Sequence, residues 1–286
     1  MECKLKTFAA IDVGSYELAM KIFEFSPKTG MKEIDHIRHR IDLGNDTFAA
    51  GKISYEKVDE LCSILREFAD IMKTYRVEGY KAYGTSAIRE TDNTAIILDQ
   101  IRQRTGISIG VLSNSEQRFL DYKSIALKSA DFGKIIEKGT AILDIGGGSI
   151  QLSLFDKDTL VATQNLRIGV LRLQELLDKL NVKPSKHEGL LEEMIDSQLS
   201  VFKRMYLKDR NVENIIVVDD YVSMLLQKRI AGSQRSGYVD SEGYGRFMEY
   251  LRTHSKEEAA AHFDVSEESL RLIGISATLI RRVVKL

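Results

Sequence analysis

The chain has 286 residues, of which 43% are apolar and 29% are charged. This composition supplies a substantial core and excludes a disordered chain, and the length suits one large domain or two ordinary ones. Because 41 basic residues stand against 42 acidic ones, the formal net charge is −1, and the chain as a whole does not attract nucleic acid or an anionic membrane. An anionic ligand must therefore be captured locally, by loops and a few basic side chains.

The chain carries two cysteines, Cys3 and Cys62, which lie far apart and match no metal-binding spacing. We interpret them as reduced, structural thiols. The N-terminus runs directly into a predicted strand without the apolar stretch of a signal peptide, and no apolar run approaches the length of a membrane span. We therefore expect a cytoplasmic protein.

The first half of the chain alternates predicted strands and helices in the order β-β-β-α-β-α-β, which is typical of an α/β domain. His36 and His39 fall on opposite faces of one predicted strand, so they are poorly placed to share a metal ion. The predicted elements are a β-hairpin over 7–24, a strand over 33–43, a helix over 54–75 with Ser54 as its N-cap, a strand over 79–83, a helix over 93–106, a strand over 107–112 and a helix over 115–128.

The second half repeats this pattern from Gly139 onward. Its predicted elements are a glycine-rich hairpin, a strand over 159–168, helices over 171–180 and 186–205, a strand over 214–218, a helix from about Tyr221, and helices over 243–262 and 266–286. We therefore expect two α/β lobes, residues 1–125 and 126–286, with the ligand in the cleft between them. The last helix, 270–286, is a candidate to complete the N-terminal lobe. No proline- or serine-rich linker separates the halves, which favours lobes that hinge.

The most informative motif is Asp144-Ile145-Gly146-Gly147-Gly148-Ser149, which lies between two β-type runs. Three glycines between strands let the backbone approach a ligand closely, and we expect them to adopt the left-handed φ values of an anion-binding nest. The carboxylate of Asp144 would repel a phosphate held by this turn unless a cation lay between them. The motif therefore predicts a site for a phosphate and Mg²⁺.

A second motif, Asp12-Val13-Gly14-Ser15, repeats this logic near the N-terminus. Taken alone, such a turn is more often an ordinary hairpin turn than a binding site. Two copies in one chain, one of them with a triple glycine, favour a paired phosphate cradle instead.

Four segments carry a resemblance to a known family. They are Ile11-Asp12-Val13-Gly14-Ser15, Gly84-Thr85-Ser86-Ala87-Ile88-Arg89, Val111-Leu112-Ser113-Asn114-Ser115-Glu116 and Leu143-Asp144-Ile145-Gly146-Gly147-Gly148-Ser149. In order and spacing the chain resembles the exopolyphosphatase/guanosine pentaphosphate phosphatase family, within the ATPase superfamily of actin, hexokinase and the Hsp70 ATPase domain. A fifth segment, residues 166–173, is similar to the one that follows the second loop. The resemblance covers about residues 7–180 and implies two actin-like (ribonuclease H-like) α/β lobes.

Hydrolysis of a phosphoanhydride requires charge neutralisation, an in-line water and the placement of both. The resemblance and this chemistry together suggest a role for each candidate residue. We predict Glu116 as the base that activates water and Arg89 as a phosphate clamp, Gly14, Ser15, Gly146, Gly147, Gly148 and Ser149 as phosphate-binding residues, and Asp12 and Asp144 as ligands of a Mg²⁺ cofactor.

Two of these residues have simpler alternatives. Arg89 could be a surface arginine paired with a neighbouring carboxylate. Glu116 follows two good helix-capping residues, Asn114 and Ser115, and an acidic residue in a first helical turn interacts favourably with the helix dipole whatever its function. The role of Arg172 in the fifth segment stays open.

The chain departs from the family pattern at several places, namely Ser15-Tyr16-Glu17 in the first loop, Gln117 and Gln151 where the family usually has glutamates, and the segments 218–221 and 268–275. We predict a Mg²⁺-dependent hydrolase that releases terminal phosphate from inorganic polyphosphate or guanosine pentaphosphate, with polyphosphate favoured. The amide substitutions support an alternative, a catalytically weak or inactive sensor of polyphosphate or the alarmone. A small-molecule kinase of the same superfamily is a third hypothesis. We expect no nucleic-acid or membrane partner, and the resemblance implies a homodimer.

Overall fold

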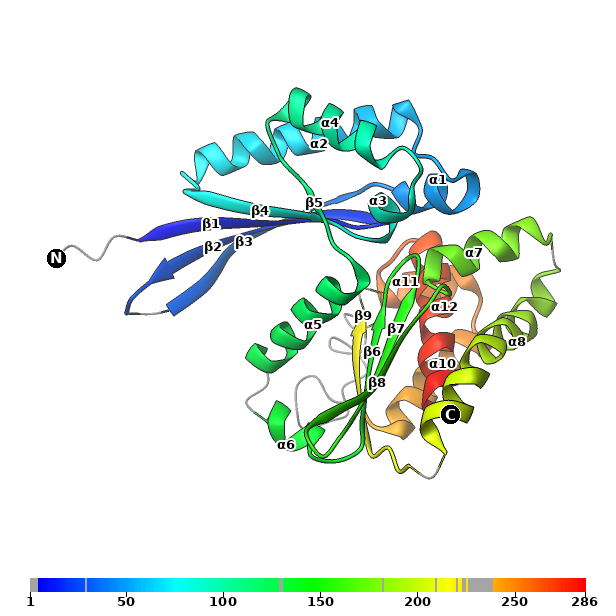
Figure 1. Ribbon diagram of the computed structural model, residues 1–286. Coiled ribbons are helices and arrows are strands. Elements are labelled where there is room, and N and C mark those ends of the chain that lie inside the picture. Colours follow the sequence, from blue (N-terminus) through cyan, green and yellow to red (C-terminus); the bar gives the residue numbers. More distant parts are fainter. Residues whose placement is uncertain are drawn as a thin grey trace. The chain divides into compact units, whose positions relative to one another are not determined.

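The computed structural model describes residues 5–28, 30–128, 131–181, 183–208, 210–219, 221–222, 225 and 239–286. The chain divides into two compact units, Met1–Tyr122 and Lys123–Leu286. Each unit combines helices with one mixed sheet, so the predicted α/β fold class is confirmed (Figure 1). Cys3 and most of the helix predicted from about Tyr221 lie outside the described residues. Within the described ranges, no helix is both long and apolar enough to cross a membrane.

The sheet of the first unit has the strand order β3-β2-β1-β4-β5. β1, β2 and β3 form an antiparallel meander, whereas β4 lies parallel to β1 and β5 parallel to β4. The strands are β1 (Lys6–Val13), β2 (Glu17–Ser26), β3 (Gly30–Arg40), β4 (Gly79–Gly84) and β5 (Gly110–Val111). The hairpin predicted over 7–24 is confirmed, and the strand expected over 107–112 is much shorter.

Helices α2 and α4 cover one face of this sheet (Figure 1). Ala9, Ile11 and Val13 of β1 are buried in the core of this unit. Asp12, between them, is exposed because alternate residues of a strand face opposite sides. The helices of this unit are α1 (Leu43–Ala50), α2 (Tyr55–Thr74), α3 (Ser86–Glu90) and α4 (Thr94–Thr105), and α5 (Asn114–Lys128) runs from the first unit into the second. Helix α1 was not predicted because glycine, asparagine and aspartate, which are weak helix formers, follow its first residue, Leu43. Asp42 caps this helix.

The sheet of the second unit has the order β8-β7-β6-β9 and repeats the pairing of the first. β6, β7 and β8 are antiparallel neighbours, and β9 lies parallel to β6. The strands are β6 (Thr140–Ile145), β7 (Ile150–Asp156), β8 (Thr159–Leu166) and β9 (Asn214–Asp219). Every strand predicted in this half is therefore present, with ends that differ by two residues or fewer.

The helices of the second unit are α6 (Phe132–Ile136), α7 (Val170–Lys179), α8 (Pro184–Phe202), α10 (Ser241–Thr253), α11 (Lys256–Phe263) and α12 (Glu267–Val284), and α8 continues into a π-helix, η1 (Lys203–Leu207). The single helix predicted over 243–262 is wrong, because two helices occupy this region. Ser255 and Glu258 form a capping box that starts α11 anew after α10 ends.

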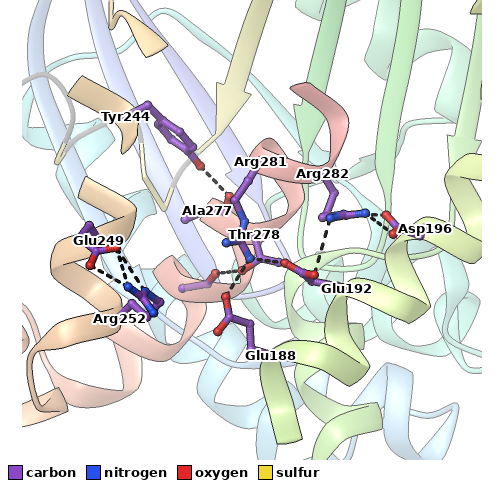
Figure 2. Close-up of polar contacts among 11 residues, drawn as sticks. Glu188, Glu192, Asp196, Tyr244, Glu249, Arg252, Ala277, Thr278, Arg281 and Arg282 are labelled. Atoms are coloured by element: carbon purple, nitrogen blue, oxygen red, sulfur yellow. Dashed lines mark hydrogen bonds and ion pairs between the residues drawn. The ribbon is translucent and has the colours of Figure 1, made fainter. Parts of the chain in front are cut away.

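Helix α12 packs within the second unit, against α7 and α8. Two consecutive arginines bind acidic residues of α8 (Figure 2). Arg281 binds Glu188 at 2.9 Å and also Glu192. The Nε of Arg282 donates to Asp196 at 2.7 Å. These pairs fix the register of α12 along α8.

Candidate functional site

The β1–β2 and β6–β7 hairpins, which carry the predicted motifs, end in turns of the same construction. In each turn a glycine N–H donates to the carbonyl three residues later, Gly14 to Glu17 and Gly146 to Ser149, both at 3.0 Å. Gly14 and Gly146 are therefore structurally equivalent, and so are the aspartates two residues before them. The duplication that the sequence predicted extends to the hydrogen bonds of the turns.

The carbonyl groups of the glycine-rich turn point to the N-terminus of α7. The carbonyl of Gly146 accepts from the N–H of Val170 at 3.0 Å, and that of Gly147 accepts from the N–H of Leu171 at 2.9 Å. In the part of the chain that the structure describes, no protein group accepts from the N–H groups of residues 147–149. Successive backbone N–H groups without a protein acceptor can bind an anion.

The glycines of this turn do not adopt the left-handed conformation that we expected. Among the described residues, the glycines with positive φ are Gly30, Gly51 and Gly106, which belong to neither motif. A glycine outside the turn, Gly169, is required for the close approach of α7 to it. A Cβ added to Gly169, just before α7, would lie 2.3 Å from the backbone nitrogen of Ser149. Gly169 is thus a site residue that our prediction missed, although it lies in the fifth segment of the resemblance.

The side chain of Ser149 is part of a polar row that crosses the second sheet. Ser149 is 8% exposed, and its Oγ accepts a hydrogen bond from Nδ2 of Asn165 at 3.1 Å. Asn165 lies beside Gln151, which lies beside Asp144 on the next strand. Asn165 was missed because these contacts join residues that only the strand register brings together.

Arg172, whose role the sequence left open, lies in the first turn of α7. Its Nε donates to the carbonyl of Gly148 at 2.9 Å. A guanidinium fixed beside the turn places positive charge close to the predicted phosphate site.

The turn of the first unit is closed by different neighbours. Ser15 is 6% exposed, and its carbonyl accepts from the N–H of Gly44 in α1 at 2.7 Å. The last residue of the turn, Glu17, accepts a hydrogen bond from Nε of Arg38 at 2.6 Å. The structure therefore buries Ser15 in a turn that contacts α1, as the turn of the second unit contacts α7.

Asp12 and Asp144 occupy equivalent positions near the ends of β1 and β6, where Asp12 is exposed and Asp144 is half-buried. Within the described ranges, no three His, Cys, Asp or Glu side chains gather so that they could hold a metal ion. Mg²⁺ usually takes one or two carboxylates, with phosphate oxygens and water as its other ligands. Each aspartate, within its own unit, therefore offers one carboxylate of the kind that suits a Mg²⁺ ion bound together with a phosphate.

Arg89, on the short helix α3, reaches toward the start of α5. Its Nη1 donates to the carbonyl of Leu112 at 2.7 Å, and its Nη2 donates to Ser86 Oγ at 3.3 Å. It makes no ion pair with any described residue, so the alternative of a surface pair is not supported. Burial lowers the pKa of Arg89, although an arginine stays charged in proteins.

Glu116 takes part in a capping box at the start of α5. Its Oε2 accepts from the N–H of Ser113 at 2.9 Å and from the Ser113 hydroxyl at 2.7 Å, and Ser113 Oγ accepts from the N–H of Glu116 at 3.2 Å. The N-cap is therefore Ser113, and not Asn114 or Ser115 as expected. The backbone N–H of Ser113, and then its hydroxyl, lower the pKa of Glu116. No described residue bonds to the other carboxylate oxygen, Oε1.

Residues 22–285 match the Ppx/GppA phosphatase family. The chain therefore belongs to this family, and the resemblance inferred from the motifs is confirmed. Its fold is that of solved family members. The structure of an exopolyphosphatase from Cytophaga hutchinsonii matches 98% of this chain and 90% of its own chain, with a TM-score of 0.78 and 20% identity. A Ppx/GppA family member from Aquifex aeolicus matches 99% of this chain and 90% of its own, with a TM-score of 0.73 and 18% identity.

Two kinds of enzyme are similar to the chain in sequence. Exopolyphosphatase 1 of Mycobacterium leprae is 28% identical over 192 residues, which are 66% of this chain and 55% of the relative. The guanosine-5'-triphosphate,3'-diphosphate pyrophosphatase of Aliivibrio fischeri is 25% identical over 162 residues, which are 57% of this chain and 31% of the relative. The matched region thus spans about half the length of the mycobacterial relative and less of the other.

Proposed function

We propose that the chain is a Mg²⁺-dependent phosphoanhydride hydrolase that releases terminal orthophosphate from inorganic polyphosphate. The turn at residues 146–149 carries this proposal. N–H groups of α7 bind the carbonyls of the turn, whereas the N–H groups of residues 147–149 lack an acceptor in the described part of the chain. Membership of a phosphatase family and similarity to an exopolyphosphatase support the reaction class. Guanosine pentaphosphate is the other candidate substrate, given the similarity to a guanosine-5'-triphosphate,3'-diphosphate pyrophosphatase.

In this proposal the two turns bind neighbouring phosphoryl groups of one substrate, residues 146–149 on one side and Gly14 with Ser15 on the other. Arg89 neutralises the transferred phosphoryl group. It uses the guanidinium N–H donors that do not bind Leu112 or Ser86. Glu116 orients the attacking water and takes its proton on Oε1, the oxygen outside the capping box.

Mg²⁺ held by Asp12 and Asp144 would neutralise the phosphate oxygens and so reduce the repulsion between the substrate and these carboxylates. We also propose that the protein acts in the cytoplasm and forms a homodimer. The paucity of cysteine supports the first of these two proposals, and the family resemblance supports the second.

A sensor that binds polyphosphate or the alarmone without rapid turnover is the second candidate. Glu116 favours it, because hydrogen bonds from Ser113 lower its pKa and so weaken it as a base. Gln117 favours it too, since its amide oxygen accepts from Arg89 at 3.5 Å where a carboxylate would form an ion pair.

Glu116→Gln tests the role of Glu116 in the proposed hydrolase. For the hydrolase we expect phosphate release with Mg²⁺ to fall by about 10²–10⁴-fold, the usual contribution of one positioned base, with polyphosphate binding retained. Glu258→Gln is a matched control, because Glu258 is the third residue of α11 in a capping box of the same kind. Equal rates for Glu116→Gln and the wild type would refute the role of Glu116.

A phosphate-release screen over polyphosphates, guanosine pentaphosphate, ATP and pyrophosphate, with and without Mg²⁺, identifies the substrate. We expect release from polyphosphate to be fastest and to require Mg²⁺. Tight binding of polyphosphate with no release from any of these compounds would support the sensor instead.

A further inference from the structure

A side chain of the third strand supports the hairpin turn in each unit. In the second unit, Nδ2 of Asn165 on β8 donates to Oγ of Ser149 at 3.1 Å. In the first unit, Nε of Arg38 on β3 donates to Oε1 of Glu17 at 2.6 Å. In each unit the contact joins the last residue of the turn to a residue of the third strand. The register partner of that residue lies two positions after the last residue of the turn. The support is therefore a repeated feature of the fold, and only its chemistry differs.

The chemistry of the second unit suits an anion. The amide nitrogen of Asn165 can only donate, so the hydroxyl of Ser149 accepts and keeps its own proton for another acceptor. Among the described residues, none accepts that proton. A hydroxyl polarised by such a bond is a stronger donor, and a phosphate oxygen is a strong acceptor. Because Ser149 is 8% exposed, few waters compete for the hydroxyl.

We propose that Asn165 is a positioning residue of the phosphate site. It turns the hydroxyl of Ser149 so that the proton points to a phosphoryl oxygen bound by the turn at residues 146–149. Asn165 does not itself touch the substrate, and its effect passes through Ser149. This inference rests on the proposed function, because it concerns the same phosphate site.

The same two strands offer a matched control. Ser153 on β7 and Thr163 on β8 are register partners, and their hydroxyl oxygens lie 3.1 Å apart. They lie on the same sheet face as the register pair Gln151 and Asn165, but two residues further from the turn. Thr163→Val therefore removes a hydrogen bond between β7 and β8 side chains without touching the turn.

The test uses the full chain and tripolyphosphate with Mg²⁺, and it compares Asn165→Ala, Ser149→Ala, the double variant and Thr163→Val. Phosphate release gives kcat and KM, and calorimetry gives the affinity for tripolyphosphate. We expect Asn165→Ala to lower kcat/KM and affinity by about 10-fold, because the hydroxyl of Ser149 would lose its hydrogen bond to the charged phosphate. In the Ser149→Ala background, Asn165→Ala should lower kcat/KM and affinity by less than about 2-fold. Thr163→Val should change both quantities by less than about 2-fold as well.

Each outcome decides a different point. Equal losses for Asn165→Ala and Thr163→Val, or a loss that persists in full in the Ser149→Ala background, would overturn the positioning role and leave Asn165 as a sheet contact. If the affinities for tripolyphosphate change as expected but neither the wild type nor any variant releases phosphate, the inference is upheld and hydrolysis is refuted. Normal release and affinity in Asn165→Ala would refute the inference but not the hydrolase. No binding of tripolyphosphate by the wild type would refute both.

Discussion

Gly169 shows how closely the backbone is packed around the glycine-rich turn. A Cβ at this position would lie 2.3 Å from the nitrogen of Ser149 and 2.4 Å from the carbonyl oxygen of Gly147. Both atoms belong to the backbone, so no side-chain rotation can relieve the clash. The same carbonyl binds the N–H of Leu171 at 2.9 Å, and a displaced α7 would lose this bond. The turn keeps its shape because the residue before α7 has no side chain.

We therefore expect Gly169→Ala to lower the free energy of unfolding by about 1–3 kcal/mol, as overpacking does elsewhere. Phosphate release should fall with it, because the N–H groups at residues 147–149 move with the turn. Urea unfolding measures the first effect and steady-state release the second. Gly245→Ala is the control, since a Cβ there meets nothing within 4 Å and alanine favours a helix. Similar unfolding energies for the two variants would contradict the packing argument.

The sequence located the residues of the turn but misjudged why they are glycines. A triple glycine after an aspartate indicates a backbone that approaches a ligand closely, and this stays a prediction. The choice of left-handed φ was wrong because a local motif cannot reveal which segment packs against it. Asn165 could not be predicted for the same reason, because its contact with Ser149 depends on the pairing of β7 with β8.

Among the elements, α5 shows how one residue can serve both a helix and a reaction. The sequence Ser113-Asn114-Ser115-Glu116 fits a capping box as well as a catalytic motif, and the structure contains the box. Because hydrogen bonds from Ser113 lower the pKa of Glu116 in the folded state, they stabilise the fold above the unfolded-state pKa. This stabilisation is lost as the pH falls through the folded-state pKa.

Ser113→Ala tests whether the box tunes the reaction. The change removes the hydroxyl donor but keeps the backbone N–H, which is the larger cause of the lowered pKa. The pKa of Glu116 should therefore rise partway to its ordinary value. If Glu116 is the base, the acid limb of the kcat/KM profile should move to higher pH, with little change in rate near neutrality. A pH–rate profile measures this, and an acid limb that stays in place would assign it to another group.

Helices whose apolar residues recur at regular spacing were predicted well. Helices that are short, or that are marked only by the residues that start and end them, were not. Helix α2 was predicted with its N-cap, Ser54, because its buried residues recur at helical spacing. The split between α10 and α11 was missed, although residues 252–258 are all polar and the box at Ser255 and Glu258 marks the new start. Helix α3 was also missed, because five residues carry no periodic signal.

At the scale of the whole molecule, the chain contains one supersecondary pattern twice. In both units three antiparallel strands are followed by a strand parallel to the first, and the helix after the third strand donates an N–H to the turn between the first two strands. Gly44 binds the carbonyl of Ser15 in one unit, as Leu171 binds that of Gly147 in the other. The sequence predicted this repetition from two short motifs, because a strand–turn–strand unit is encoded by neighbouring residues.

If the two turns act on one substrate, their serines should be energetically coupled. We expect Ser15→Ala and Ser149→Ala each to weaken tripolyphosphate binding by about 10-fold with Mg²⁺ present. The double variant should lose less than the product of the single losses, because a phosphate chain released by one turn is held poorly by the other. Orthophosphate, which is too short to engage two turns, should show no such coupling. Calorimetric titration of both ligands measures the cycle. Independent losses with tripolyphosphate would mean that the turns do not share a substrate, and the proposal of a paired phosphate cradle would then be wrong.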